Sequence, residues 1–355
     1  MRVVPVTTAA PPSLSRIARR VDQRIRALLE SELDRWTAVD DDLTAPLEAL
    51  GRLVLAGGKR LRPAFCHWAF VGAGGSPDDP AVVDAGAALE LLHTFALIHD
   101  DIMDGSSTRR STGTIHVQFE ERHALDGWRG EGRRFGEGVA VLVGDLAFVY
   151  ADRLLADAPR EAMAVFTELR VEVNIGQFLD LIGTARGEVG ETLARRISLF
   201  KSGKYTVERP LHLGAALAGR LDDLAAPLSA FGLPLGEAFQ LRDDLLGAFG
   251  DEAVTGKPVG EDLREGKPTL LYAAARSRLG DTSPLLDRYG AADITDDEIA
   301  DLQDLLVESG AVAHVESTID DRAREAVAVL DRAPLTGEAS TALAELARFV
   351  AGRDR

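Results

Sequence analysis

Apolar residues recur at the spacing of an α-helix through nearly all of the 355-residue chain. Ile25, Leu28 and Leu29 form one such set, and Val165, Leu169 and Val173 form another. Strict alternation of apolar and polar residues, which is typical of strands, is nearly absent. No repeat of about 20–50 residues is visible, which disfavours a solenoid. The sequence therefore predicts an all-α protein.

Glycine, proline and polar clusters divide the chain into separate helices. We expect them near residues 14–37, 43–56, 61–72, 80–104, 137–156, 160–184, 190–208, 210–219, 223–249, 267–279, 294–308, 310–332 and 338–351. The connections 105–138 and 250–266 are long and rich in glycine and charge, so we expect them to be binding loops. No linker separates two halves, so we predict a loose arm at 1–13 and one domain at 14–355.

The formal net charge of −17 argues against nucleic acid or an anionic membrane surface as a partner, because both attract basic proteins. The apolar run at 139–150 is shorter than a membrane span and contains Asp145, and the N-terminus lacks the apolar core of a signal peptide. The single cysteine, Cys66, has no partner for an internal disulfide. We therefore expect a cytoplasmic protein without a transmembrane segment.

Three carboxylates lie at the end of an apolar predicted helix. On a helix, Asp100 and Asp104 lie on nearly the same face, with Asp101 to one side. Such close like charges repel unless a cation joins them, and oxygen ligands suit Mg²⁺ that also carries substrate phosphates. We expect the three to converge on one metal-binding patch. The alternative is an ordinary solvated helix end.

A second acidic pair, Asp243 and Asp244, lies in another apolar helix, with Gln240 one turn before Asp244. Two inward-facing acidic patches on separate helices are a known way to build a multi-metal site in a bundle. Two such pairs in apolar helices favour metal binding more than one would.

Lysine placement gives an independent argument. Only five of the 40 basic residues are lysines, namely Lys59, Lys201, Lys204, Lys257 and Lys267. Because arginine supplies the ordinary surface charge, these lysines are candidates for sites that need a compact ammonium group. Chance in an arginine-rich composition is the alternative.

In order along the chain, the motifs are GGKRLRP at 57–63, ELLHTFALIHDDIMD at 90–104, an arginine pair at 109–110, VGDLAF at 143–148, GQFLD at 176–180, Lys-Ser at 201–202, FQLRDD at 239–244 and TGKPVGEDLREGKPTLL at 255–271. This series, spanning about residues 45 to 280, resembles the trans-isoprenyl diphosphate synthases, also called polyprenyl synthetases. Within that family it is most similar to bacterial geranylgeranyl diphosphate synthases.

The resemblance implies an isoprenoid-synthase-type helical bundle around a deep cavity, usually in a homodimer. It implies three Mg²⁺ ions per active site, with Mn²⁺ as an alternative ion, held between the two acidic helices. The implied metal ligands are Asp100, Asp101, Asp104, Asp243 and Asp244. The implied allylic-diphosphate ligands are Arg109, Lys201, Ser202, Gln240, Lys257 and Lys267. The implied isopentenyl-diphosphate ligands are Gly58, Lys59, Arg62, His93 and Arg110.

The implied reaction is Mg²⁺-dependent ionisation of an allylic diphosphate, followed by head-to-tail attack of isopentenyl diphosphate on the carbocation. Among the departures from the family pattern, Ser202 replaces the usual threonine, and the nearby Thr206 leaves open which hydroxyl faces the cavity. Gly247 stands where the third acid of the second motif is usual.

In the family, the side chains just before the first acidic motif form the floor that stops the growing chain. Here Phe95 and Ala96 occupy the fifth and fourth positions before Asp100, about 7 Å down the helix. An aromatic residue without an insertion in the motif resembles geranylgeranyl diphosphate synthases, so we predict a C20 product. Farnesyl diphosphate (C15) is the alternative.

Two other functions remain open at this point. A class I terpene cyclase also ionises a prenyl diphosphate, although its second metal motif usually carries asparagine or aspartate, serine or threonine, and glutamate. A catalytically silent partner subunit is the non-enzymatic alternative, but such a chain is expected to lack one acidic motif, and this one retains both.

Overall fold

The computed structural model describes residues 10–110, 112–186, 190–250, 260–280 and 283–352. Helices form almost all of the secondary structure within these residues, which confirms the all-α prediction. Two of the elements, η1 and η4, are 3-10 turns, and η2 is a π-helix. In order along the chain, the elements are α1 (Pro12–Thr37), η1 (Asp41–Leu43), α2 (Thr44–Leu55), α3 (Leu61–Gly72), α4 (Pro80–Asp104), β1 (Thr108–Arg109), β2 (Thr112–Gly113), α5 (Ile115–Leu125), α6 (Gly132–Leu154), α7 (Arg160–Arg186), α8 (Glu191–Ile197), η2 (Ser198–Glu208), α9 (Arg209–Leu217), α10 (Leu221–Phe249), α12 (Glu261–Glu265), α13 (Leu270–Leu279), η4 (Leu286–Arg288), α14 (Asp296–Glu308), α15 (Ala311–Leu330) and α16 (Gly337–Gly352).

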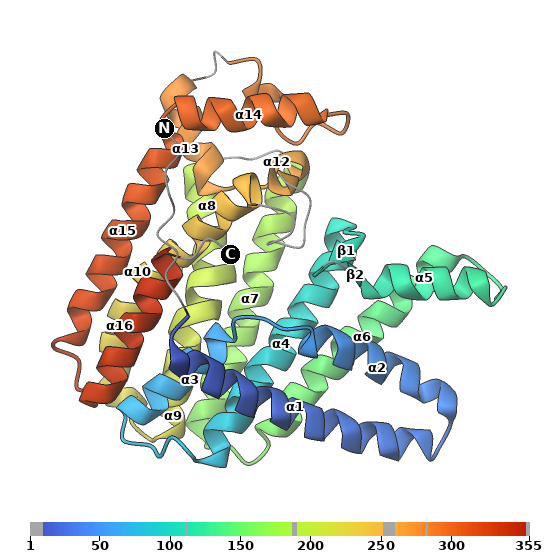
Figure 1. The fold of residues 1–355 in the computed structure, drawn as a ribbon, viewed down its shortest axis with the longest axis vertical. Helices are drawn as coiled ribbons and strands as arrows, with labels where there is room; N and C mark the ends of the chain where they lie inside the picture. Colours follow the sequence, from blue (N-terminus) through green and yellow to red (C-terminus); the bar gives the residue numbers. More distant parts are fainter. Residues whose placement is uncertain (1–9, 111, 187–189, 251–259, 281–282, 353–355) are drawn as a thin grey trace.

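Helix α4 lies in the middle of the bundle, with α6 alongside it (Figure 1). Its ends follow local sequence signals. The Asp79 side chain accepts a hydrogen bond from the Ala81 amide, Pro80 opens the first turn, and Gly105 ends the helix in the left-handed conformation. The helix therefore presents its last turn, which contains the first acidic motif, at a fixed place.

Among the described residues, α4 is also the one helix with the length and apolar composition of a membrane span. Buried residues make up 61% of that window, as expected for the core helix of a globular protein.

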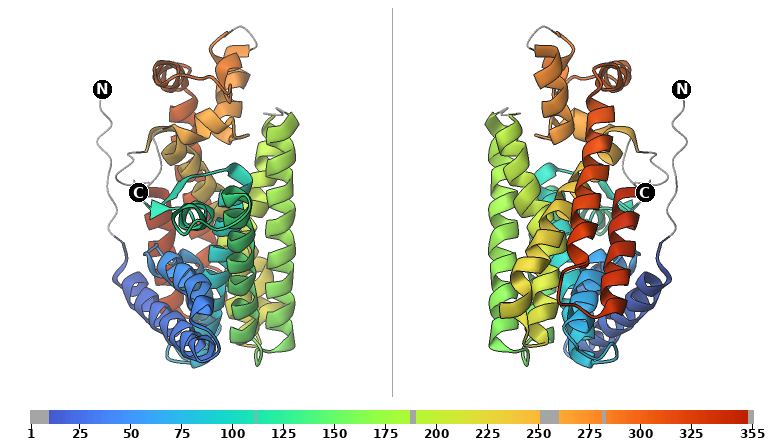
Figure 2. Two further views of the ribbon diagram at one scale, coloured as in Figure 1. Left: turned by 90° about the vertical axis from the view of Figure 1, so that its right-hand side faces the viewer. Right: turned by 90° about the vertical axis from the view of Figure 1, so that its left-hand side faces the viewer.

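Figure 2 shows α7, in light green, upright along one side of the molecule and α15 and α16, in red, along the other. Helix α10 connects these two sides. Its first half, including Phe231 and Leu235, belongs to the larger core cluster with α1, α3, α4, α6 and α7. Its second half, including Leu241 and Leu245, belongs to a smaller cluster with α13, α14 and α15. One helix thus contributes to both parts of the core.

The two long connections differ from the prediction. The expected loop 105–138 contains the β1–β2 hairpin, all of α5 and the first turns of α6. The described part of 250–266 contains α12. The expected helix 190–208 is split into α8 and the π-helical η2. Short, charged or glycine-flanked helices give weak periodicity, so the sequence pattern did not reveal them.

Candidate active site

A cavity of about 370 Å³ lies between α4, α7, η2, α10 and the segment around α12. Carboxylates and lysines of these elements line one part of it, and Phe95, Ala96 and Val173 line another. Several distant segments of the sequence therefore meet at one charged and partly apolar site.

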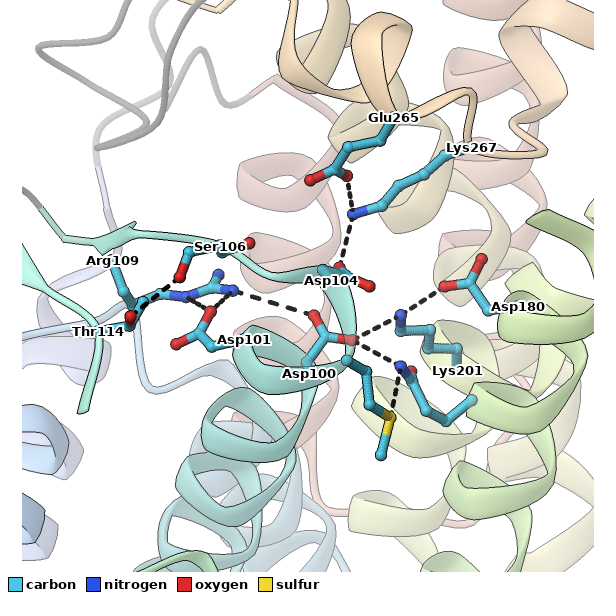
Figure 3. A network of polar contacts seen from close by, with 12 residues as sticks. Asp100, Asp101, Asp104, Ser106, Arg109, Thr114, Asp180, Lys201, Glu265 and Lys267 are labelled. Atoms are coloured by element: carbon cyan, nitrogen blue, oxygen red, sulfur yellow. Dashed lines mark hydrogen bonds and ion pairs between the residues drawn. The ribbon is translucent and has the colours of Figure 1, made fainter. Parts of the chain in front are cut away.

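Asp100 is at the centre of the polar contacts drawn in Figure 3. Its Oδ1 accepts hydrogen bonds from Gln177 at 2.8 Å and from the Lys201 Nζ at 3.2 Å. Burial opposes ionisation of this carboxyl, but the charges of Lys201, Lys267 and Arg109 outweigh it and lower the pKa to about 2. Asp100 is therefore an anion at neutral pH.

The other two acids of the first motif point to different cations. Asp101 is buried and accepts hydrogen bonds from the Arg109 Nε at 2.8 Å and from its Nη2. Asp104 pairs with the Lys267 Nζ at 3.2 Å. Asp101 therefore faces Arg109 in this structure, and its role as a metal ligand stays a prediction.

Two lysines connect the acidic groups across the cavity. The Lys201 Nζ lies 2.6 Å from Asp180 on α7, and the Lys267 Nζ lies 2.7 Å from Glu265. Burial alone disfavours the ammonium form, but the surrounding carboxylates raise the pKa of both lysines. Both therefore carry a positive charge at neutral pH.

The second acidic motif has one acid held from both sides. Asp244 accepts hydrogen bonds from the Leu270 amide at 3.1 Å and from the Gln240 Nε2 at 2.6 Å. Burial raises its pKa to about 7, although these hydrogen bonds oppose the shift. Asp243 also lines the cavity.

Gly247, where the third acid of the motif is usual, lies directly against Asp262 of α12. A Cβ atom at Gly247 would lie 1.8 Å from the Asp262 Oδ2. Asp262 itself lines the cavity. A carboxylate from another element thus fills the space where a side chain at 247 would begin.

Arg62 and His93 line the cavity together with Tyr205 and Thr206. The Arg62 Nη2 donates to the Thr206 Oγ1 at 2.9 Å, and its Cζ lies 4.3 Å from the centre of the Tyr205 ring. Its Nε is buried and makes no hydrogen bond to any described residue. Burial, and then the charges of Arg62 and Arg110, lower the pKa of His93 well below its usual value.

The GGKR turn and Arg110 lie outside the cavity lining. Gly57 and Gly58 have φ of 102° and 139°, which other residues rarely adopt. The Arg110 Nη1 donates to the Leu53 carbonyl at 2.9 Å, and its Nη2 is near Gly58. Gly58, Lys59 and Arg110 are therefore close to one another, whereas only Arg62 and His93 of the predicted isopentenyl set line the cavity.

Ser202 and Thr206 both line the cavity, so position alone does not choose between their hydroxyls. They differ in partner, because the Ser202 hydroxyl donates to the Gln240 Oε1, while Thr206 accepts from Arg62. Gln240 thus connects Ser202 to Asp244. The predicted ligand Lys257 lies outside the described residues.

The predicted floor has a second layer. The Phe95 ring lies 4.9 Å from the Phe148 ring of α6, measured between centroids. The Arg170 guanidinium of α7 lies 5.0 Å from the Phe148 ring and is held by Asp152 at 2.7 Å. Phe148 backs Phe95 without being part of the cavity lining.

The donor set fits divalent metal ions. Asp100, Asp243, Asp244 and Asp262 supply hard oxygen ligands from three elements around one cavity. Within the described residues, no three acidic, histidine or cysteine side chains are grouped closely enough to hold an ion by themselves. Such a site suits an ion that is completed by water and substrate phosphates.

Sequence reasoning gave no role to Gln177, Asp180, Phe148 or Asp262, although each lies within a motif quoted above. The spacing of Gln177 and Asp180 on one face of a predicted helix could have revealed the first two. No sequence signal pairs Phe148 with Phe95, or Asp262 with Gly247.

The family described as Polyprenyl synthetase matches residues 45–306. The chain is 35% identical over 280 residues to geranylgeranyl diphosphate synthase of Mycobacterium tuberculosis, covering 77% of this chain and 75% of that protein. It is 31% identical to geranylfarnesyl diphosphate synthase of Aeropyrum pernix, covering 83% and 89%. A crystal structure of geranylgeranyl pyrophosphate synthase from Corynebacterium glutamicum, complexed with isoprenyl diphosphate and magnesium, superposes with a TM-score of 0.85 at 36% identity, covering 94% of this chain and 98% of that one.

Proposed function

Because this chain belongs to the polyprenyl synthetase family and is a trans-prenyl diphosphate synthase, we propose that its cavity joins isopentenyl diphosphate head to tail to an allylic diphosphate. One observation carries the proposal. Acidic residues of two helices and two charged lysines line the same cavity as the aromatic residue Phe95. Such a site can hold a diphosphate at one part and a prenyl chain at another.

Members of the family depend on divalent metal ions. We propose Mg²⁺, three ions per site, with Mn²⁺ as an alternative. Asp100, Asp101 and Asp104 on one side would hold them, together with Asp243 and Asp244 on the other. When bound, the ions offset the negative charge that develops on the departing diphosphate.

Asp262 completes this set in our proposal and replaces the third acid that Gly247 lacks. Its carboxylate already occupies the space beside Gly247 and lines the cavity.

Lys201, Lys267 and Arg109 hold the allylic diphosphate in our proposal, and Lys257 is a further candidate. Their charges stabilise the diphosphate as the C–O bond breaks and its electron pair leaves with the oxygen. The Ser202 hydroxyl and the Gln240 amide hydrogen-bond to each other, and in our proposal they stabilise the carbocation.

Arg62 and His93 bind isopentenyl diphosphate in our proposal, with Gly58, Lys59 and Arg110 nearby. The buried Nε of Arg62 supports this role, because a diphosphate oxygen can accept its hydrogen bond. The double-bond electrons of isopentenyl diphosphate attack the allylic carbon, and a proton then passes to the released diphosphate. No protein nucleophile takes part.

We propose that the main product is geranylgeranyl diphosphate (C20), with farnesyl diphosphate (C15) as the alternative. Phe95 and Ala96 line the cavity one to two turns before Asp100, and Phe148 supports Phe95 from behind. Relatives with geranylgeranyl products support this length, although relatives with other product lengths also match.

We also propose that residues 14–355 act as one domain, that two copies associate as a homodimer, and that the protein is cytoplasmic. Exposed apolar side chains on two helices support the dimer: Val141, Leu142 and Val149 of α6, and Val171, Ile175 and Phe178 of α7. Arg170 and Asp152 join the two helices at 2.7 Å. The unpaired, buried Cys66 suits a reducing compartment.

The test is incubation with isopentenyl diphosphate, Mg²⁺ and dimethylallyl, geranyl or farnesyl diphosphate, followed by chain-length analysis of the product. We expect a C20 diphosphate and no turnover after chelation of the metal. A hydrocarbon formed from geranylgeranyl diphosphate alone would indicate a cyclase instead. No product until a second protein is added would indicate a silent subunit.

A further inference from the structure

The segment η2 is a π-helix of eleven residues, Ser198–Glu208. A π-helix usually occurs as a single turn inserted in an α-helix, often at a functional site. Lys201, Ser202, Tyr205 and Thr206 of η2 all line the cavity. The side chains that face the substrates therefore depend on an unusual backbone, and something must hold that backbone in place.

Helix α7 contacts η2 at three residues spaced one turn apart on one face, Glu172, Gly176 and Asp180, and all three are buried. A Cβ atom at Gly176 would lie 2.9 Å from the Lys201 amide nitrogen, so the glycine permits close approach of the two backbones. Asp180 binds the Lys201 Nζ at 2.6 Å (Figure 3).

On the opposite side, α10 packs equally closely. A Cβ atom at Gly236 would lie 2.3 Å from the Gly203 Cα. This contact lies one turn before Gln240, the partner of Ser202. The middle of η2 is thus enclosed between two helices through backbone contacts.

The end of η2 is held by one acid. The Glu172 carboxylate accepts hydrogen bonds from the Lys204 Nζ at 2.6 Å, the Arg209 Nε at 2.6 Å and the Arg209 Nη2 at 2.8 Å. Lys204 belongs to the π-helix, and Arg209 is the first residue of α9, where the α-helical pattern resumes. Glu172 therefore bridges the residues on both sides of this change of pattern. Burial opposes its ionisation, but hydrogen bonds from Arg209 and Lys204 outweigh this and lower its pKa.

We infer that Glu172 is a positioning residue for prenyl transfer. By holding Lys204 and Arg209, it fixes the π-helical register of η2 and thereby keeps Lys201 and Ser202 directed into the cavity. This inference rests on the proposed function for its catalytic consequence, but the effect on the backbone does not depend on it.

The test compares Glu172→Gln with Glu32→Gln, a matched control far from the cavity. Glu32 is also buried and also accepts from three side chains, Arg153, Tyr150 and Trp36. Both substitutions remove a buried negative charge and keep the side-chain shape, so both are expected to lower the melting temperature.

Two readouts separate positioning from stability. Hydrogen exchange of the amides 198–208, measured by mass spectrometry, should become at least about tenfold faster in Glu172→Gln and stay unchanged in Glu32→Gln. At a temperature where all variants are folded, kcat/KM for the allylic diphosphate should fall by about tenfold or more only in Glu172→Gln, because small displacements of catalytic groups are costly. Lys204→Gln, which keeps the Arg209 contact, should give a smaller change in the same direction.

Wild-type exchange of residues 198–208 in Glu172→Gln would overturn the inference. So would an equal loss of kcat/KM in Glu172→Gln and Glu32→Gln, because that result points to general destabilisation. If Glu172→Gln does not fold, Lys204→Gln provides the test instead. Unchanged exchange of residues 198–208 and unchanged kcat/KM in Lys204→Gln would then overturn the inference. If exchange becomes faster in Glu172→Gln but the wild-type protein itself transfers no prenyl group, only the proposed function is contradicted.

Discussion

Neighbouring acids in this sequence have different roles because their partners differ. Asp100 faces the cavity with Gln177 and Lys201, whereas Asp101 is buried against Arg109. Asp244 is held by Gln240 and a backbone amide. At the scale of single residues, therefore, the contacts of a carboxylate, more than its place in a motif, decide what it can do.

Replacing Asp100 tests the metal assignment. We expect Asp100→Ala to reduce turnover on the order of a thousandfold or more. The substitution removes a metal ligand, so the negative charge on the departing diphosphate is less well stabilised. Circular dichroism and the melting temperature should remain close to wild type, since Asp100 lies at the end of α4. Turnover near the wild-type rate would contradict the assignment.

Restoring the usual third acid of the second motif should lower the activity of this protein. In Gly247→Asp, the new side chain would collide with Asp262 and place a like charge beside it. We expect lower activity and a higher Mg²⁺ requirement in a titration of activity against metal concentration. The double variant Gly247→Asp with Asp262→Gly should recover part of the loss. An active single variant with unchanged Mg²⁺ dependence would argue against our placement of Asp262.

His67 lies outside the cavity lining and should make the folding stability depend on pH. Burial, and then the charges of Arg20 and Arg16, lower its pKa to about 4. Because the folded pKa lies below that of the unfolded chain, this stabilisation is present above about pH 6.5 and is lost as the pH falls towards 4.

Urea unfolding at pH 7.5 and pH 5 provides the measurement for His67. The free energy of unfolding of the wild type should fall by about 2 kcal/mol more than that of His67→Gln, which cannot gain the proton. Equal losses in the two proteins would show that His67 is not the group responsible.

At the scale of elements, α6 supports from behind the part of α4 that carries the predicted floor of the cavity. The floor predicted from α4 alone was Phe95 and Ala96, and the contact between Phe95 and Phe148 adds α6 to it. Arg170 of α7 stacks on the far side of Phe148. If Phe95 limits the product as we propose, the length of the product depends on how these three helices pack.

Truncating either ring should lengthen the product. We expect Phe95→Ala, and more weakly Phe148→Ala, to shift the distribution towards chains longer than those of the wild type, because each opens space below the cavity. Chromatography of the hydrolysed products measures this shift. Leu146→Ala is the control, since Leu146 of α6 packs against the core and does not line the cavity. An unchanged distribution in Phe95→Ala would remove the basis for the floor.

At the scale of the whole molecule, α6 and α7 each expose a row of large apolar side chains. Val141, Leu142 and Val149 follow one face of α6, and Val171, Ile175 and Phe178 follow one face of α7. Large exposed apolar patches mark interaction sites in soluble proteins. The formal charge of −17 makes this apolar face stand out on an otherwise acidic protein.

Charges placed on that face should separate the proposed dimer. We expect wild type to have twice the mass of the chain by light scattering, and Leu142→Glu combined with Phe178→Glu to have the mass of one chain. Val307→Glu, on the exposed side of α14, is the control and should leave the mass unchanged. A wild-type protein with the mass of a single chain would contradict the proposal.

The sequence predicted the α4 boundaries correctly, because proline, an acidic N-cap and a closing glycine act within a few residues. It also indicated the family, since the motifs occur in order. It missed α5 and α12, whose periodicity is weak, and the π-helical pattern of η2, because the packing of Gly176 and Gly236 against η2 depends on helices that are distant in the sequence.

The sequence by itself therefore determined most of the long helices and the charged motifs that reach the site, because helix signals and motifs are local. Only the tertiary structure decided that Asp101 faces Arg109, that Asp262 fills the space beside Gly247 and that Phe148 supports Phe95. These pairings join residues on different elements or across a turn, and their geometry depends on how the helices pack. A local pattern in the sequence does not specify how distant helices pack against one another.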